Sequence, residues 1–210
     1  GIKPLVGVEV VLEERELPLP ERPGPLGLVP DPPPPGTPLP RITLLAENRR
    51  GYRNLCRLLT EAARERPKGH ARAAWRQVEV HAEGLYCLTG GAEGLVAQHL
   101  IHRGPEAARR TLERLAALFP GRLSVELQRH GLRAEEHRNR LMVDLAGRLR
   151  LPLAATGVVP GSPPEGQGLA GVLACNRQGT RLHLAGRLPE GQRPRHLKPG
   201  AECGRRFDRL

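Results

Sequence analysis

The sequence predicts an α/β domain in which most strands are parallel. Short runs rich in Val and Leu alternate with segments of helical periodicity, which favours parallel βα units in an open sheet or a barrel. Hydrophobic residues make up 39% and charged residues 26% of the 210 residues, which is typical of a globular chain. Apolar runs stay far below the roughly 20 residues of a membrane span.

The first part of the chain contains two predicted strands and one helix. Leu5–Val11 is a Val-rich run interrupted by the charge of Glu9, and Ile42–Leu45 is the second strand. Leu17–Pro40 holds 11 of the 22 prolines and is expected to form an extended, poorly ordered loop. Gly51–Arg64 follows as a helix, and its apolar residues share one face: Tyr52, Leu55, Cys56, Leu59 and Ala63.

The second part continues the alternation. Strands are predicted at Leu85–Leu88, Leu123–Leu127 and Leu151–Thr156. The intervening helices are predicted at Trp75–His81, at Glu93–His102, from Pro105 through Phe119, at Ala134–Leu149 and at Gly168–Asn176. Proline is favourable at the first position of a helix, because its missing N–H would be unpaired there anyway. Leu112, Leu115 and Phe119 are expected to line one helix, and Leu141, Leu145 and Leu149 another.

The charge is unevenly distributed along the chain. Lys and Arg number 33 against 22 Asp and Glu, a net charge of +11 that favours polyanionic partners. Residues 177–210 contain nine basic and three acidic residues, so this segment supplies about half of the excess. We expect residues 1–176 to form the domain and 177–210 a basic, poorly ordered segment. Aromatic residues are only 2%, which argues against an aromatic platform for single-stranded nucleic acid.

The four cysteines, Cys56, Cys87, Cys175 and Cys203, lie far apart. No CxxC spacing supports a zinc knuckle or a thioredoxin-type motif. The chain begins without the pattern of a signal peptide, so we expect reduced thiols in the cytoplasm and no membrane. Cys56 and Cys87 fall in apolar patterns and are interpreted as core residues.

A collinear series of motifs suggests a family. It comprises Gly1–Glu9, Ile42–Asn48, Gly51–Thr60, His81–Leu85, Leu88–Gly91, Val125–Gly131, Leu153–Thr156 and His196–Lys198. The series resembles the PHP (polymerase and histidinol phosphatase) domain of bacterial C-family DNA polymerases, that is, the alpha subunit of DNA polymerase III and the error-prone branch. The resemblance implies an internal, N-terminally truncated portion of such a polymerase, ending before the polymerase palm. It also implies an α/β fold, namely an incomplete, distorted β/α barrel of mostly parallel strands with helices on its outer face, left open on one side.

The resemblance also identifies the positions of the family's metal ligands. Glu9 matches the glutamate ligand, whereas a histidine ligand falls at Arg41 and a cysteine ligand at Gly91. An aspartate and a histidine fall at Val158 and Pro160, and a preceding His pair lies upstream of Gly1. Divalent metals in the intact family activate water for attack on phosphorus. One remaining ligand does not hold a catalytic metal, so no cofactor is expected for this chain, and Glu9 is a vestigial ligand.

Each candidate residue also has a structural interpretation. Glu9 is either this vestigial ligand or a solvent-facing carboxylate. His99 and His102 have metal-ligand spacing, although a solvated helix face is favoured. Glu126 and His130 suggest acid–base chemistry or a structural role, and we favour the second. Thr89-Gly90-Gly91 is either a phosphate-binding loop at a helix N-terminus or a tight strand-to-helix turn, and we favour the turn.

The leading functional hypothesis is a PHP portion of a bacterial error-prone DNA polymerase that acts structurally, without catalysis. DNA and proteins of replication and repair would then be partners of the parent polymerase. One alternative is a stand-alone metal-dependent phosphoesterase, which needs a histidine cluster. The other is a basic nucleic-acid-binding module, which needs its charge on one ordered face.

Overall fold

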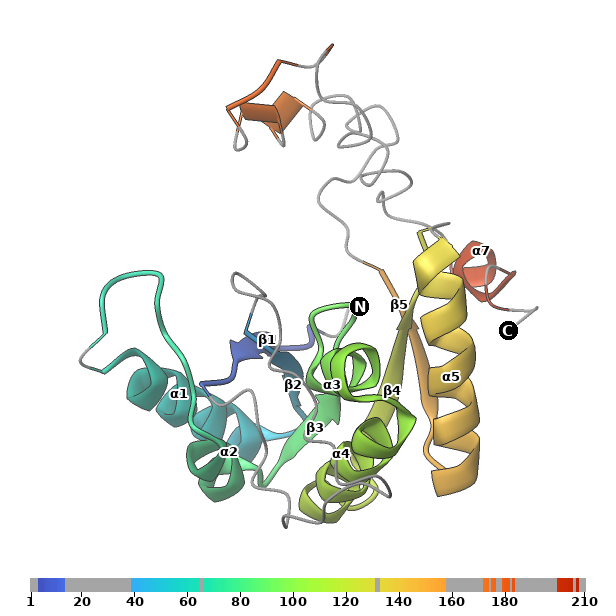
Figure 1. The fold of residues 1–210 in the computed structure, drawn as a ribbon. Helices are drawn as coiled ribbons and strands as arrows, with labels where there is room; N and C mark the ends of the chain where they lie inside the picture. Colours follow the sequence, from blue (N-terminus) through green and yellow to red (C-terminus); the bar gives the residue numbers. More distant parts are fainter. Residues whose placement is uncertain are drawn as a thin grey trace. The chain divides into compact units, whose positions relative to one another are not determined.

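The computed structural model describes residues 4–13, 39–64, 66–130 and 133–157, with short stretches between 172 and 207 (Figure 1). Its contacts divide the chain into two compact units. The first comprises Gly1–Glu126 and Leu141–Ala154, and the second Leu127–Arg140 and Ala155–Leu210. The predicted loop Leu17–Pro40 and the ligand positions Val158 and Pro160 lie almost wholly outside the described residues.

Five strands form one sheet in the order β1-β2-β3-β4-β5. Their bounds are β1 Gly7–Val11, β2 Arg41–Ala46, β3 Leu85–Leu88, β4 Leu123–Gln128 and β5 Leu153–Thr156. The prediction of mostly parallel strands is wrong: β1 and β2 are antiparallel, as are β2 and β3, while β3 and β4 are parallel. The result is a mixed sheet that does not close into a barrel.

Strand direction depends on how the connections pack. A parallel pair requires a crossover, usually through a helix, whereas antiparallel strands do not. The proline-rich connection between β1 and β2 has no helical periodicity, and these strands run in opposite directions. Two helices separate β2 from β3, which are antiparallel, and two also separate β3 from β4, which are parallel. The alternation of strands and helices therefore does not fix the direction of each strand.

The helices largely confirm the sequence periodicity. They are α1 Arg49–Ala63, α2 Trp75–His81, α3 Leu95–Arg103, α4 Pro105–Leu118 and α5 Arg133–Leu149. A further helix, α7 Gly200–Arg205, lies in the segment for which no element was predicted. Helix α1 packs against β2 and β3, and it also contacts α2, while α3 packs against α4 (Figure 1).

The strand register separates an apolar face from a mixed face. Ile42 and Leu44 are fully buried, and their neighbours across the ladders are Val10 and Cys87, which are buried as well. Leucines of α1 and α4, and Phe119, are buried as well. The alternate positions carry Glu9, Arg41, Thr43 and Tyr86, which are exposed or half-buried. Charged side chains of β1 and β2 therefore share the face opposite the main core.

Helix α1 presents a different face from the one predicted. Its buried residues are Gly51, Leu55, Leu58 and Ala62. Tyr52 is 51% exposed and Leu59 37% exposed, so these two residues do not belong to the core. The reason is a close backbone contact at Gly51, where a Cβ atom would lie 1.8 Å from the carbonyl oxygen of Gly84. That contact turns Gly51, rather than Tyr52, toward the interior.

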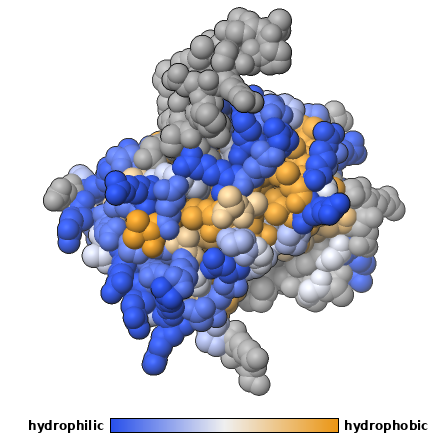
Figure 2. Space-filling model, turned by 90° about the horizontal axis from the view of Figure 1, so that it is seen from below, coloured by the Kyte–Doolittle hydropathy of each residue, from blue (hydrophilic) through white to orange (hydrophobic). Residues whose placement is uncertain are grey.

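Apolar residues also reach the surface. Val80 on α2 is 67% exposed, Ile101 on α3 is 55% exposed, and Leu5 just before β1 is 67% exposed. Figure 2 shows hydrophobic residues gathered between hydrophilic ones on one face of the molecule. Within the part of the chain that the structure describes, no helix is both long and apolar enough to cross a bilayer.

Candidate functional site

Arg41 contacts two carboxylates at the start of β2. Its Nη1 donates a hydrogen bond of 2.9 Å to Glu9 Oε2 on β1. Its Nε lies 3.1 Å from Glu93 Oε2, an ion-pair contact that lacks the alignment of a hydrogen bond. Glu93 belongs to the turn between β3 and α3. One guanidinium therefore connects three segments that are distant in the sequence.

The turn that carries Glu93 lies tightly against β2. Gly90 has φ +81°, a left-handed conformation that favours glycine. A Cβ atom on Gly94 would lie 2.3 Å from the carbonyl oxygen of Thr89, so this position also requires glycine. The backbone N–H of Gly94 donates to Gly91 O at 3.0 Å, which closes the turn before α3 begins. These contacts support the tight-turn interpretation of Thr89-Gly90-Gly91.

The residues present do not fit a metal centre. A guanidinium has five donors, no acceptor and a permanent charge, so Arg41 cannot ligate a cation. Gly91 has no side chain, and Glu9 already contacts Arg41. No group of three or more His, Cys, Asp or Glu side chains is placed to hold a metal within the described residues, that is, 4–13, 39–64, 66–130, 133–157 and the short stretches beyond them. The donor chemistry at these positions thus differs from that of the divalent-metal site that the resemblance implies for the intact family.

A second polar group lies where β3 and β4 pair. The hydroxyl oxygens of Tyr86 and Ser124 are 2.6 Å apart. The backbone N–H of Glu126 donates to Thr89 Oγ1 at 2.9 Å, and the Glu126 side chain is buried within β4. These contacts join β3, and Thr89 directly after it, to β4. They give Glu126 a defined structural setting in β4.

His130 is oriented by a glutamate that the sequence analysis did not single out. His130 Nδ1 lies 2.8 Å from Glu135 Oε1, and the His130 backbone N–H donates to Glu135 Oε2 at 2.7 Å. Both side chains are less than a tenth exposed. Arg129 likewise makes two hydrogen bonds to Glu136, which raise the pKa of Arg129. The available signal was the pair of acidic residues in the first turn of α5, where the helix dipole favours negative charge.

The sequence pattern favoured a solvated helix face for His99, and this prediction is wrong. Its side chain is buried, and its Nδ1 lies 2.6 Å from Thr111 Oγ1 on α4. Thr111 Oγ1 in turn donates to Ala107 O at 2.9 Å. The prediction failed because α4 covers this face of α3, a tertiary contact that helical spacing does not reveal. His102 is half-buried near the end of α3.

Cys56 and Cys87 have opposite environments. Cys87 is fully buried, as predicted. Burial is the main cause that raises the pKa of its thiol, and the nearby Glu126 carboxylate raises this pKa further. Cys56 is exposed, so its interpretation as a core residue is wrong. The rotation of α1 set by Gly51 accounts for this difference.

These environments predict selective thiol chemistry. Because alkylation requires an accessible thiolate, Cys56 should react with iodoacetamide in the native protein, while Cys87 stays protected until the protein unfolds. Peptide mass spectrometry after timed labelling, with and without denaturant, measures both sites in one sample. Comparable native labelling of the two cysteines would contradict the burial and pKa described here.

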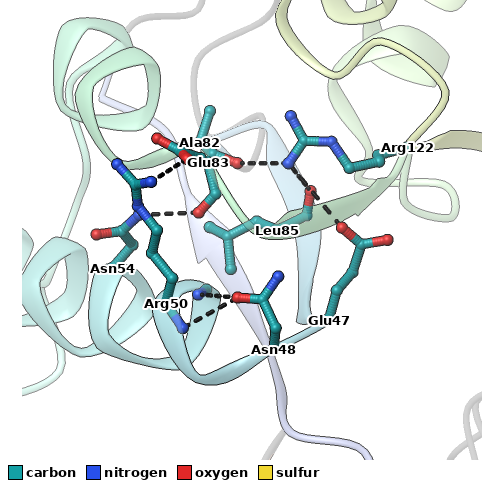
Figure 3. A network of polar contacts seen from close by, with 9 residues as sticks. Glu47, Asn48, Arg50, Asn54, Ala82, Glu83, Leu85 and Arg122 are labelled. Carbon is teal, nitrogen blue, oxygen red and sulfur yellow. Dashed lines mark hydrogen bonds and ion pairs between the residues drawn. The ribbon is translucent and has the colours of Figure 1, made fainter.

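A third polar network fixes the turn between α2 and β3 against the start of α1 (Figure 3). Asn48 Oδ1 accepts hydrogen bonds from the backbone N–H groups of Arg50 and Gly51, both at 3.0 Å. Arg50 forms an ion pair with Glu83, and Asn54 Nδ2 donates to Glu83 O at 2.8 Å.

Arg122 contacts the same turn from the start of β4. Its Nη1 donates to the carbonyls of Ala82 and Leu85 at 3.3 and 3.2 Å, and lies 4.0 Å from a Glu47 carboxylate oxygen. The network consists of caps and ion pairs that position the backbone.

Comparison with known proteins supports the resemblance. A family model described as PHP domain matches residues 1–130. The DNA polymerase III subunit alpha of Vibrio cholerae is 30% identical over 165 residues, covering 76% of this chain and 12% of that protein. The error-prone DNA polymerase of Mycobacterium tuberculosis is 34% identical over 179 residues, covering 84% of this chain and 16% of the relative. The DNA polymerase III subunit alpha of Pseudomonas aeruginosa is 30% identical over 211 residues, covering 100% of this chain and 16% of that protein. The chain thus spans less than a fifth of the length of these relatives.

Proposed function

Because this chain belongs to the PHP domain family, we propose that it acts as the structural, non-catalytic PHP portion of a bacterial error-prone DNA polymerase. In this proposal the parent polymerase synthesises DNA in the cytoplasm during translesion synthesis or repair. DNA and proteins of replication and repair are partners of the parent. The role of this portion is to fold and to support the polymerase, rather than to cleave phosphate esters.

The observation that carries the proposal is the placement of Arg41. The guanidinium contacts Glu9, the residue matched to a family ligand, and it occupies a position matched to a histidine ligand. Water activation by a divalent metal requires lone-pair donors around an open coordination position, which Arg41 cannot supply. A stand-alone metal-dependent phosphoesterase would need such donors in the same place.

An activity assay separates the two functions. We expect the purified chain, incubated with Mn²⁺ or Zn²⁺, to show no hydrolysis of bis(p-nitrophenyl) phosphate and no exonuclease activity beyond that of a matched Glu9→Gln preparation. Metal-dependent hydrolysis that co-purifies with the chain and is lost in Glu9→Gln would overturn the proposal in favour of the phosphoesterase. Tight DNA binding by the isolated chain, weakening steeply with salt, would instead favour a basic nucleic-acid-binding module.

The structural role is tested in the full-length parent polymerase. Phe119→Ala, in the core of this portion, should lower the Tm and primer extension together, because extension depends on a folded PHP portion. Glu9→Gln, at a half-exposed ion pair, should leave extension within about twofold of the wild type. If Phe119→Ala lowers the Tm of this portion while extension is unchanged, the proposed structural role is refuted.

A further inference from the structure

We propose that Arg41 is a built-in cation, which joins β1, β2 and the β3–α3 turn where a metal would otherwise sit and prevents divalent cations from binding there. The inference rests on the proposed non-catalytic function and extends it to a specific residue. Its starting point is that the guanidinium contacts two carboxylates from separate elements, Glu9 on β1 and Glu93 in the turn.

The strand register fixes the first contact. Glu9 lies opposite Thr43 in the β1–β2 ladder, and Arg41 lies opposite Val11. Arg41 and Thr43 are two residues apart on one strand, so their side chains point to the same face as Glu9. Diagonal neighbours on one face lie within reach of a long side chain. The Arg41–Glu9 pair therefore follows from the fold of the sheet.

The backbone fixes the second contact. The Arg41 N–H donates to the carbonyl oxygen of Glu93 at 2.9 Å, and Arg41 also forms a parallel bridge with Gly94. The turn is thus attached to the start of β2 before any side chain is considered. Gly90 and Gly94 allow the tight turn itself, since a Cβ atom on Gly90 would lie 2.9 Å from the Cα atom of Gly94. Glu93 is consequently held beside the guanidinium.

Charge explains why a metal is excluded. A guanidinium group is permanently charged, so Arg41 offsets the charge of one of its two carboxylate partners without any bound ion. A divalent cation would have to displace a covalently attached cation and would be repelled by it. Arg109 also contacts two glutamates, but both are on its own helix α4. Arg66 contacts Glu13 at 2.6 Å and serves as a matched control with a single carboxylate partner near β1.

The experiment compares metal binding by four variants of the chain with the wild type. Arg41→His removes the permanent charge and leaves an imidazole with two carboxylates, and Arg41→His/Glu9→Gln then removes one of them. Arg41→Gln removes the charge and supplies a neutral amide oxygen instead of an imidazole, and Arg66→His is the control. Isothermal titration with Zn²⁺ and with Mn²⁺ measures affinity, and circular dichroism with thermal melting confirms folding.

We expect Arg41→His to bind Zn²⁺ at least tenfold more tightly than the wild type, and Glu9→Gln to abolish that gain. Arg66→His should show no gain, and Mn²⁺ should raise the Tm of Arg41→Gln but not of the wild type. A folded Arg41→His that gains no affinity, or a wild type that binds as tightly as Arg41→His, overturns the inference. If Arg41→His does not fold, the absence of a Mn²⁺-dependent Tm rise in Arg41→Gln overturns it instead. The first of these failures would leave the proposed function standing, because it reveals no hydrolytic activity.

Discussion

Replacing Gly51 with alanine is expected to destabilise the protein by at least about 3 kcal/mol, because the added methyl group has no space. A Cβ atom at this position would lie 1.8 Å from Gly84 O and 2.6 Å from the Gly84 carbonyl carbon. Both are backbone atoms, so no side-chain rotation can relieve the overlap. Helix α1 would have to move away from the turn before β3. Urea unfolding followed by circular dichroism measures the loss.

The surrounding network opposes that movement. The Glu47 N–H donates to Gly84 O at 3.1 Å. Asn48 caps α1 by accepting a hydrogen bond from the Gly51 N–H (Figure 3). Asn54 holds the same turn through the carbonyl oxygen of Glu83. Moving α1 away from Gly84 therefore strains or breaks several hydrogen bonds together. The loss of a cap alone costs about 0.5–2 kcal/mol.

Gly147→Ala is the matched control for this prediction. Gly147 also lies in a helix, α5, but nothing surrounds its Cβ position within 4 Å. Alanine is the better helix former, so this substitution should stabilise the protein by about 0.5–1 kcal/mol. The same chemical change thus has opposite expected signs at two helical glycines. Similar effects at both positions would show that the Gly51–Gly84 contact is not formed.

The sequence predicted the helices and strands well, because their signals are local. The proposed bounds of Trp75–His81 and Leu85–Leu88 are those of α2 and β3. Pro105 begins α4 as expected, since proline is favourable at the first position of a helix. Strand direction was less predictable, because it depends on connections whose packing involves the whole sheet. The same limit explains His99, whose burial depends on contact with Thr111 of another helix.

The candidate site was only partly predictable. The family resemblance singled out Glu9 and Arg41, but treated Arg41 as the loss of a ligand. Their pairing became visible only through the antiparallel register of β1 and β2, which the expected parallel sheet did not contain. Glu93 comes from a turn far along the chain, and no motif connected it with β2. Long-range pairing of this kind has no periodic signal in one sequence.

Phe119→Ala is expected to cost about 3–5 kcal/mol, the usual range for truncating a fully buried aromatic residue. Phe119 is 0% exposed and directly follows α4, where its backbone N–H donates to Leu115 O at 2.8 Å. The loss is largest where the surrounding side chains cannot collapse into the space that the ring leaves. Denaturant midpoints, interpreted at constant m-value, give the change in stability.

Tyr52→Ala tests the orientation of α1 with the same measurement. The sequence pattern placed Tyr52 in the core, whereas the structure leaves it 51% exposed. Surface substitutions usually change stability by no more than about 0.5 kcal/mol, and partial burial of the ring allows a loss of up to about 1 kcal/mol. Phe119→Ala should therefore be at least about three times as costly as Tyr52→Ala. Equal losses at the two positions would mean that α1 buries the face that its periodicity predicts, and that the rotation imposed by Gly51 is wrong.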